Sequence, residues 1–188
     1  MRVIAGEYRS RPLSAPRGLD TRPTSDRLRE TLFNVLTPRI ADAVFLDLYA
    51  GSGAVGIEAL SRGAREAIFV EQADAPMKAI RANLSALGIA GRYALEQRSA
   101  AAALRRLAEN ERVADIVFLD PPYADVEGYA ATLGLLGGTS RSILAPDAIV
   151  IAEHEKRREL DERYGDLVRY RVLQQGDAAL SFFQLAAD

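Results

Sequence analysis

A glycine-rich segment with an acid on either side is the first part of this chain that could do chemistry. Residues 51–56 read Gly-Ser-Gly-Ala-Val-Gly, which is the spacing G-x-G-x-x-G, directly after the apolar run 44–48. Asp47 lies four residues before Gly51, and Glu71 lies 20 residues after it. Such glycines let the backbone turn close to a ligand, and an acid at the distance of Glu71 can accept from ribose hydroxyls.

Asp47 discriminates between two ligand classes. A dinucleotide brings a pyrophosphate, which needs backbone donors and no carboxylate nearby. S-adenosylmethionine has no phosphate and carries an ammonium and a sulfonium, which a carboxylate favours. We therefore predict S-adenosylmethionine as the cofactor and disfavour a nicotinamide-binding reductase. The alternative is that Asp47 only caps the loop and that the glycines only permit a turn. The predicted contacts of this loop and its acids are Asp47, Ala50, Gly51, Ser52, Gly53 and Glu71.

A second chemical motif, Asp120-Pro121-Pro122-Tyr123, ends the apolar run 115–119. An exocyclic amine of a base is a poor nucleophile because its lone pair is delocalised into the ring. Asp120 and a carbonyl of the proline pair could each accept one N–H, which frees that lone pair for a methyl group. Tyr123 offers a face on which a base taken out of its stack can lie. We predict these four residues as catalytic, the alternative being a simple strand-ending turn.

The elements that position both motifs alternate between strand and helix. Apolar runs at 44–48, 67–71, 92–97, 115–119 and 148–153 predict strands, and helical stretches separate them. Such alternation predicts a parallel sheet covered on both faces, with ligands at the carboxyl ends of the strands. Two further strands, 167–173 and 180–185, flank a turn and predict an antiparallel hairpin.

The N-terminal region differs in charge from the rest. Residues 1–39 contain eight arginines and four acids, whereas the whole chain has 24 basic and 26 acidic residues. A basic end is a possible nucleic-acid footprint, or else a solvated tail. Residues 2–13 predict a short edge-type β element, followed by a helix from Thr24 or Ser25 to about Pro38. We predict that the phosphate contacts are Arg9, Arg11, Arg17 and Arg22.

Other chemistries find little support in the composition. The chain has no cysteine, which excludes disulfides and thiol catalysis, and its single histidine, His154, cannot build a multi-histidine metal site. No apolar run approaches the roughly 20 residues of a membrane span, and no signal core follows the N-terminus. We expect a cytoplasmic protein, a monomer, with no metal and no membrane association.

The chain resembles the bacterial family of 16S ribosomal RNA guanine-N2 methyltransferases that modify guanine 966 of the small subunit. The resemblance spans nearly the whole length. Its specific part is the block 21–34, Thr-Arg-Pro-Thr-Ser-Asp-Arg-Leu-Arg-Glu-Thr-Leu-Phe-Asn; the glycine loop and Asp-Pro-Pro-Tyr are shared by many amino-methyltransferases. Further matches are residues 2–6, 9–13 and 58–64, together with Glu71, Asn83 and Gly176-Asp177.

The resemblance implies a Rossmann-like class I methyltransferase fold with a seven-stranded, mostly parallel sheet in residues 24–188. It also implies that residues 1–23 form an extension that contacts RNA and closes over the cofactor. Thr24 is a weaker candidate for the methionine end of the cofactor. Many class I enzymes hold the adenine with an acid or amide after the third strand, and this chain has Ser99 there.

The implied substrate is 16S ribosomal RNA, alone or in the small subunit. The main alternative is an adenine-N6 methyltransferase of DNA or RNA, because Asp-Pro-Pro-Tyr suits both amines; the short chain leaves little room for a separate DNA-recognition domain. A catalytically silent RNA-binding module is the third hypothesis, and the intact acid–proline–aromatic set argues against it.

Overall fold

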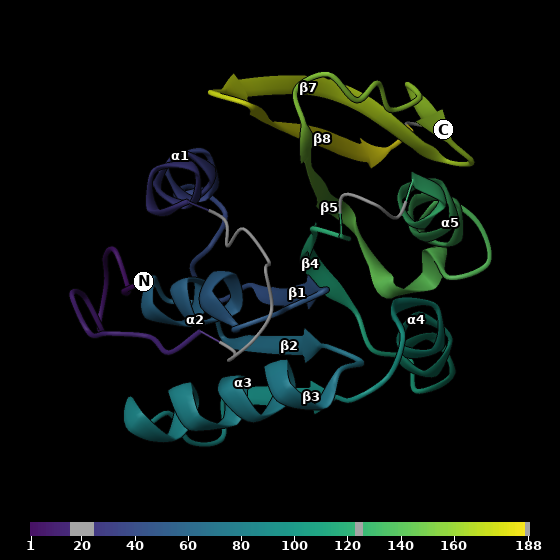
Figure 1. The fold of residues 1–188 in the computed structure, drawn as a ribbon. Helices are drawn as coiled ribbons and strands as arrows, with labels where there is room; N and C mark the ends of the chain where they lie inside the picture. Colours follow the sequence, from purple (N-terminus) through teal and green to yellow (C-terminus); the bar gives the residue numbers. More distant parts are fainter. Residues whose placement is uncertain (16–24, 123–125, 187–188) are drawn as a thin grey trace.

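A computed structural model describes residues 1–15, 25–122 and 126–186. Within these ranges the core of the protein is one mixed β-sheet between two layers of helices (Figure 1). The first five strands run parallel and are β1 (Val44–Leu48), β2 (Glu66–Val70), β3 (Tyr93–Glu96), β4 (Ala114–Leu119) and β5 (Leu144–Glu155). The helices between and before them are α1 (Asp26–Leu36), α2 (Ala54–Ser61), α3 (Asp74–Ala86), α4 (Ala100–Glu109) and α5 (Val126–Leu136).

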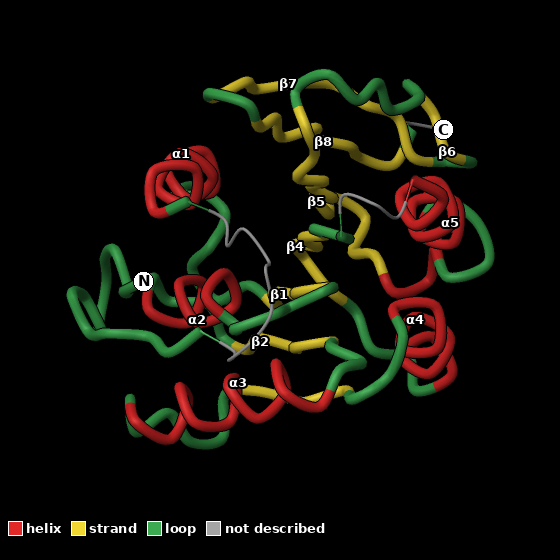
Figure 2. Tube along the Cα trace, viewed as in Figure 1, coloured by secondary structure: helices red, strands yellow, loops and turns green. Residues whose placement is uncertain are grey.

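The strand order reverses at β1. Three antiparallel strands complete the sheet: β6 (Arg163–Tyr164), β7 (Leu167–Gln175) and β8 (Ala178–Leu185). The order across the sheet is β3-β2-β1-β4-β5-β8-β7-β6. The chain leaves β1 on one side to build β2 and β3 and returns to its other side to build β4 (Figure 2). A reversal of this kind opens a crevice at the carboxyl ends of β1 and β4, where open α/β sheets bind their ligands.

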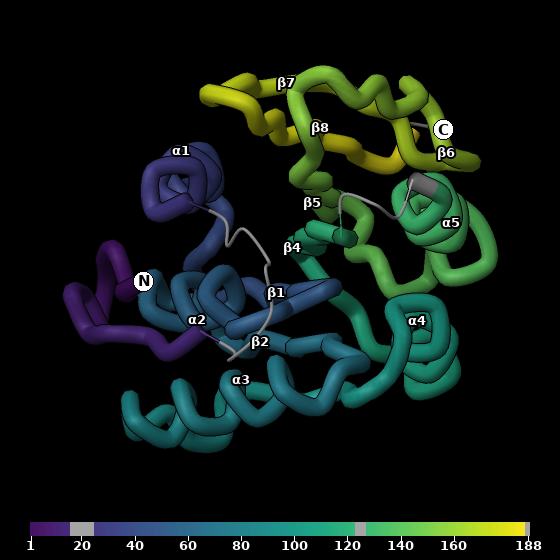
Figure 3. Tube along the Cα trace, viewed as in Figure 1, coloured from purple at the N-terminus to yellow at the C-terminus, as the bar shows by residue number. Residues whose placement is uncertain are grey.

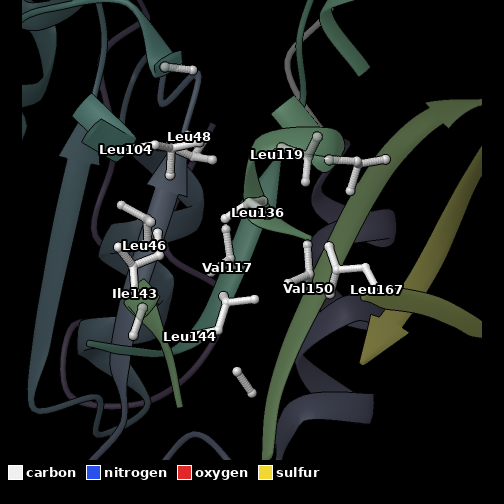
Figure 4. Close-up of a cluster of buried hydrophobic side chains, with 14 of the residues drawn as sticks. Leu46, Leu48, Leu104, Val117, Leu119, Leu136, Ile143, Leu144, Val150 and Leu167 are labelled. Carbon is white, nitrogen blue, oxygen red and sulfur yellow. The ribbon is translucent and has the colours of Figure 1, made fainter. Parts of the chain in front are cut away.

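Separate apolar clusters cover the two faces of the sheet. One face packs against α4 and α5; Figure 4 shows this cluster, with Leu48, Leu119 and Val150 from three neighbouring strands. On the other face, α1 and α2 pack against a second cluster that includes Phe45, Phe118 and Ile151. α3 completes that layer beside α2. Because the central strands are buried on both faces, they appear in the sequence as continuous apolar runs.

The N-terminal segment, residues 1–15, lies against α2 (Figure 3). Its extended ends meet in one isolated antiparallel bridge, between Arg2 and Pro12, so the predicted β element is a bridged loop and no regular strand. The buried carboxylate of Glu58 in α2 accepts from the backbone N–H groups of Ile4 (2.7 Å) and Ala5 (3.0 Å). These bonds fix the path of the segment across the helix.

The bounds predicted from the sequence for most helices and strands agree with the observed bounds within a few residues. Ser25 caps α1 by accepting from the N–H of Leu28 (3.1 Å), and the helix ends at Leu36. The strand predicted from residue 148 begins earlier, at Leu144. The described residues contain eight strands, one more than expected, because the two-residue β6 is too short to leave a pattern. None of the helices in the described ranges is long and apolar enough to cross a lipid bilayer.

Gly6 offers a test of the docking of residues 1–15. Its φ is +84°, and a Cβ there would lie 1.8 Å from the backbone oxygen of Ser61 at the end of α2. We expect Gly6→Ala to lower the free energy of unfolding by about 1–3 kcal/mol, measured by urea denaturation, because the segment must move away from α2. Gly91→Ala is the matched control, since its φ is +77° but a Cβ would have nothing within 4 Å. Equal losses for the two variants would show that residues 1–15 are not held against α2.

Candidate active site

The glycine loop begins where β1 ends. The N–H of Ala50 donates to the carbonyl of Val70 in β2 (2.9 Å), and the N–H of Gly53 turns back to the carbonyl of Ala50 (2.7 Å). Gly53 is the N-cap of α2 with a φ of +77°, a conformation that glycine adopts without strain. A Cβ on Gly56 would lie 2.4 Å from the ring of Phe69, so this glycine lets α2 approach β2. The loop therefore holds the start of α2 at the crevice.

Asp47 lies beneath this loop. Its side chain is 1% exposed, and its Oδ2 accepts from the N–H of Gly56 (2.9 Å). Burial raises the pKa of Asp47 to about 7; the Gly56 bond opposes the rise, and the charge of Glu71 adds to it. The carboxylate thus caps the first turn of α2, which is the structural role considered from the sequence. A contact with a ligand's ammonium group stays a prediction.

Glu71 reaches the same loop from the end of β2. Its Oε2 accepts from the N–H of Gly51 (3.1 Å), and its Oε1 accepts from the N–H of Ala73 (2.8 Å). The residue is half-buried. The sequence spacing between Gly51 and Glu71 therefore corresponds to a direct contact.

A cleft of about 300 Å³ lies between the start of α4 and α5. Ser99 and Gln72 line it, together with Tyr49, whose hydroxyl is 2.8 Å from Oγ1 of Thr132. Ser99 is the N-cap of α4, and its Oγ accepts from the N–H of Ala102 (3.3 Å). The predicted adenine-side residue thus lines a cleft at the carboxyl edge of the sheet, and its hydroxyl already caps a helix.

Asp120 follows β4 directly and is half-buried. Pro121 is buried and Pro122 is exposed, whereas Tyr123 lies outside the described residues. Burial raises the pKa of Asp120 well above its usual range, and the charges of Glu153 and then Asp47 raise it further. Sequence reasoning missed Glu153, which is 3% exposed at the end of β5. An acid inside the apolar run 148–153 was the signal that could have found it.

A second cleft, of about 450 Å³, lies between the N-terminal segment and the first turns of α1. Arg9 lines it, whereas Arg11 donates to the carbonyl of Ala86 in α3 (3.1 Å). Arg17, Arg22 and Thr24, also predicted from the sequence, lie outside the described residues. The lining of this cleft, which we call the arginine cleft, is Arg2, Ile4, Arg9, Ser10, Asp26, Arg27 and Glu30.

Asn83 joins the N-terminal segment to the glycine loop. Its Oδ1 accepts from the N–H of Ser14 (2.8 Å), and its Nδ2 donates to the carbonyls of Ser14 (3.0 Å) and Ser52 (3.0 Å). In the sequence, Asn83 stood out only as a position that matches the resembled family. Its bonds could not be predicted, because its two partners, Ser14 and Ser52, lie 69 and 31 residues away. This buried amide ties residues 1–15 to the loop that begins α2.

Asp47 makes stability depend on pH in a defined direction. Its pKa is about 7 in the folded protein and 3.8 as a free side chain, so between these values the folded state binds more protons than the unfolded state. The contribution of Asp47 to stability is therefore largest at low pH and decreases as pH rises through about 7. Asp47→Asn keeps an acceptor for Gly56 without the charge. We expect a higher melting temperature than wild type at pH 8 and a smaller difference at pH 5, measured by thermal unfolding without ligand. A variant less stable at pH 8 than wild type would contradict this assignment.

Comparisons with known proteins find relatives over nearly the whole chain. A family model described as "Conserved hypothetical protein 95" matches residues 1–184. A Bacillus subtilis protein named "Putative rRNA methyltransferase YlbH" is 39% identical over 171 residues, covering 91% of each chain. The Escherichia coli K12 protein named "Ribosomal RNA small subunit methyltransferase D" is 35% identical over 192 residues, covering 100% of this chain and 91% of that one.

The fold is similar over the same length. A solved structure titled "Putative methyltransferase yhhF from Escherichia coli" superposes with a TM-score of 0.82 at 37% identity, covering 100% of this chain and 99% of that one. Sequence and fold thus match from end to end. The chain belongs to the family described as Conserved hypothetical protein 95.

Proposed function

We propose that this protein transfers a methyl group from S-adenosylmethionine to the exocyclic N2 amine of a guanine in small-subunit ribosomal RNA. The observation that carries the proposal is the juxtaposition of the two motifs. Leu48 of β1 pairs with Leu119 of β4 in parallel register, so the glycine loop and Asp120 leave the sheet side by side. The names of the curated relatives supply the substrate class, and the resemblance in the sequence supplies the guanine amine.

The residues at the crevice fit an adenosyl cofactor. The backbone of Ala50–Gly53 and the half-buried carboxylate of Glu71 offer groups for the ribose and the amino-acid part. The 300 Å³ cleft beside Ser99 and Gln72 offers space for a ring. Bound there, the cofactor supplies an electrophilic methyl group on a sulfonium. Asp47 and Asp120 place negative charge at the same edge, which favours a cationic ligand and disfavours a pyrophosphate.

The chain's own part in the reaction is to hold the amine. Ionised Asp120 accepts one N–H, and a carbonyl of the Pro121-Pro122 pair accepts the other, because neither proline has an N–H of its own to compete. Tyr123 supplies a stacking face for the base. Catalysis then rests on positioning and electrostatics, which requires the base to leave its stack.

Removal of the Asp120 carboxylate tests the catalytic assignment. We expect Asp120→Ala to lower the single-turnover rate on unmodified small subunits by at least about 10²–10³, because the acceptor acts chiefly in the transition state. Affinity for S-adenosylhomocysteine, measured by calorimetry, should change far less. Glu109→Ala, an exposed acid at the end of α4, is the control. Near-normal turnover by a folded Asp120→Ala protein would show that the motif forms only a turn and has no catalytic role.

The product distinguishes guanine-N2 from adenine-N6 transfer. We expect N2-methylguanosine in small-subunit RNA after incubation with labelled S-adenosylmethionine, and no N6-methyladenosine, when the nucleosides are separated by chromatography. Tyr123→Ala should weaken capture of the base, and Tyr123→Phe should retain much of the activity because the ring face remains. Methylated adenine as the product would replace the proposal with the adenine alternative.

The arginine cleft is proposed as a phosphate-binding part of the RNA surface. Arg2, Arg9 and Arg27 are exposed at its rim, and α1 begins there, where a helix N-terminus favours anions. Arg11, Arg17 and Arg22 remain proposed contacts on the same end of the chain. With this substrate we propose a cytoplasmic enzyme that acts as a monomer, with residues 1–23 as the RNA-contacting extension of a methyltransferase domain, 24–188.

Neutral replacement of the cleft arginines tests this surface. Arg9→Ala with Arg27→Ala should weaken RNA binding and reduce its salt dependence by about two phosphate contacts, while cofactor affinity stays unchanged. Arg105→Ala, an exposed arginine on α4, is the matched control. The measurement is fluorescence anisotropy of a labelled small-subunit RNA fragment at several salt concentrations. An unchanged salt slope in the double variant would exclude the cleft from RNA binding.

A further inference from the structure

Glu153 is a buried carboxylate with no role so far in the proposed reaction. It lies near the end of β5, and only 3% of its surface is exposed. Burial of a carboxylate among apolar residues costs free energy unless other groups stabilise the charge or a proton neutralises it. A chain that keeps an acid here, directly after the apolar residues 148–152, places charge at the carboxyl edge of the sheet.

The strand register brings Glu153 beside Asp120. Leu119 of β4 pairs with Ala152 of β5, so the next residue of each strand lies at the same level. Leu119 and Ala152 both belong to the cluster under α4 and α5. Side chains alternate along a strand, so Asp120 and Glu153 both point to the opposite face, toward α1 and α2. Leu180, which pairs with Glu153 from β8, packs in the cluster on that face and confirms the direction.

A third acid lies on the same face of the sheet, at the level of the residue two positions before Asp120. Asp47 of β1 follows Phe45 by two residues on this face and pairs with Phe118 of β4. The charges that act on Asp120 are those of Glu153 and Asp47, and Glu71 in turn acts on Asp47. All of these charges are negative. Glu153 is buried and Asp120 is half-buried, and neighbouring carboxylates that are shielded from water cannot both ionise at low cost, so we infer that they hold a proton in common.

We propose that Glu153 is a positioning residue for Asp120: the pair shares one proton while no cation is present, and a cationic ligand at the crevice releases it. This inference rests on the proposed function. It gives the Asp120–Glu153 pair a role, because the state of Asp120 that accepts an amine N–H then forms only when the site is loaded. The pair titrates as a unit, so the proton belongs to both residues.

The same pair accounts for the proton of the reaction. The amine lone pair forms the N–C bond, the S–C bond breaks, and its electron pair stays on the sulfur, which becomes a neutral thioether. The nitrogen then carries one proton too many. Asp120, within reach of that N–H, takes the proton and shares it with Glu153. The pair thereby returns to its singly protonated state as the positive charge leaves the site.

Proton release on binding tests the proposal without turnover. Isothermal titration at pH 7 in phosphate and in Tris, whose ionisation enthalpies differ, counts the protons released when S-adenosylmethionine binds. We expect wild type to release up to about one proton, and clearly more than with S-adenosylhomocysteine, whose sulfur is neutral. Glu153→Gln removes one charge of the pair at nearly constant volume, so its release should fall toward that seen with S-adenosylhomocysteine. Glu155→Gln, exposed two residues further along β5, should behave as wild type.

A pH profile supplies the second readout. In Glu153→Gln, Asp120 loses its neighbouring charge, so the acid limb of the single-turnover rate should move to lower pH by about one unit or more. Thermal unfolding and affinity for S-adenosylhomocysteine establish that the variant is folded. A folded Glu153→Gln protein with wild-type proton release and an unchanged profile overturns the proposal. Failure of either cofactor form to bind wild type would instead overturn the proposed function.

Discussion

The buried carboxylate of Glu58 fastens three separate parts of the chain. It accepts from two backbone N–H groups of the N-terminal segment, and its Oε1 pairs with Nε of Arg62 (2.7 Å). Its Oε2 lies 3.9 Å from Nε of Arg29, a fully buried residue of α1 that also donates to the carbonyl of Arg2 and to Asp26. Burial lowers the pKa of Arg29, and the charge of Glu58 opposes this. Removal of the Glu58 carboxylate would leave the buried guanidinium of Arg29 with Asp26 as its charged partner, and the loss of a charge from such a buried group costs more than the pair itself contributes.

These contacts of Glu58 and Arg29 fix where the proposed RNA surface lies relative to the glycine loop. Arg29 bonds to Arg2 and Asp26, and both residues line the arginine cleft, so α1 and the N-terminal segment form its two walls as one unit. Asn83 ties that unit to the carbonyl of Ser52 in the glycine loop. The glycine loop and the segment proposed to hold RNA are therefore joined directly through one side chain.

The carboxyl edge of the sheet carries an electrostatic cost. Asp47, Asp120 and Glu153 place acids on one face at the ends of β1, β4 and β5, where apolar side chains would stabilise the fold better. Burial raises the pKa of both Asp47 and Asp120, so the protein without ligand is less stable at high pH than it would be with neutral residues. The cationic ligand proposed above would offset this cost, and perturbed pKa values of this kind are common at functional sites.

The sequence by itself determined the order of the helices and strands and the position of both motifs, because each of these features depends on a pattern of neighbouring residues. The apolar runs predicted β1 and β4 nearly to the residue. Glu71, chosen for its spacing from Gly51, does contact the glycine loop, while its predicted contact with a ribose stays a prediction. Only the tertiary structure decided that Asp47 lies beneath the loop, that Glu58 and Asn83 hold the N-terminal segment, and that Glu153 stands beside Asp120. Apart from the Asp47–Gly56 contact, which spans nine residues, these facts depend on strand register and on helix packing between residues that lie about 30 to 70 positions apart. Register is set by which faces bury apolar area across the whole sheet, and no local pattern records it.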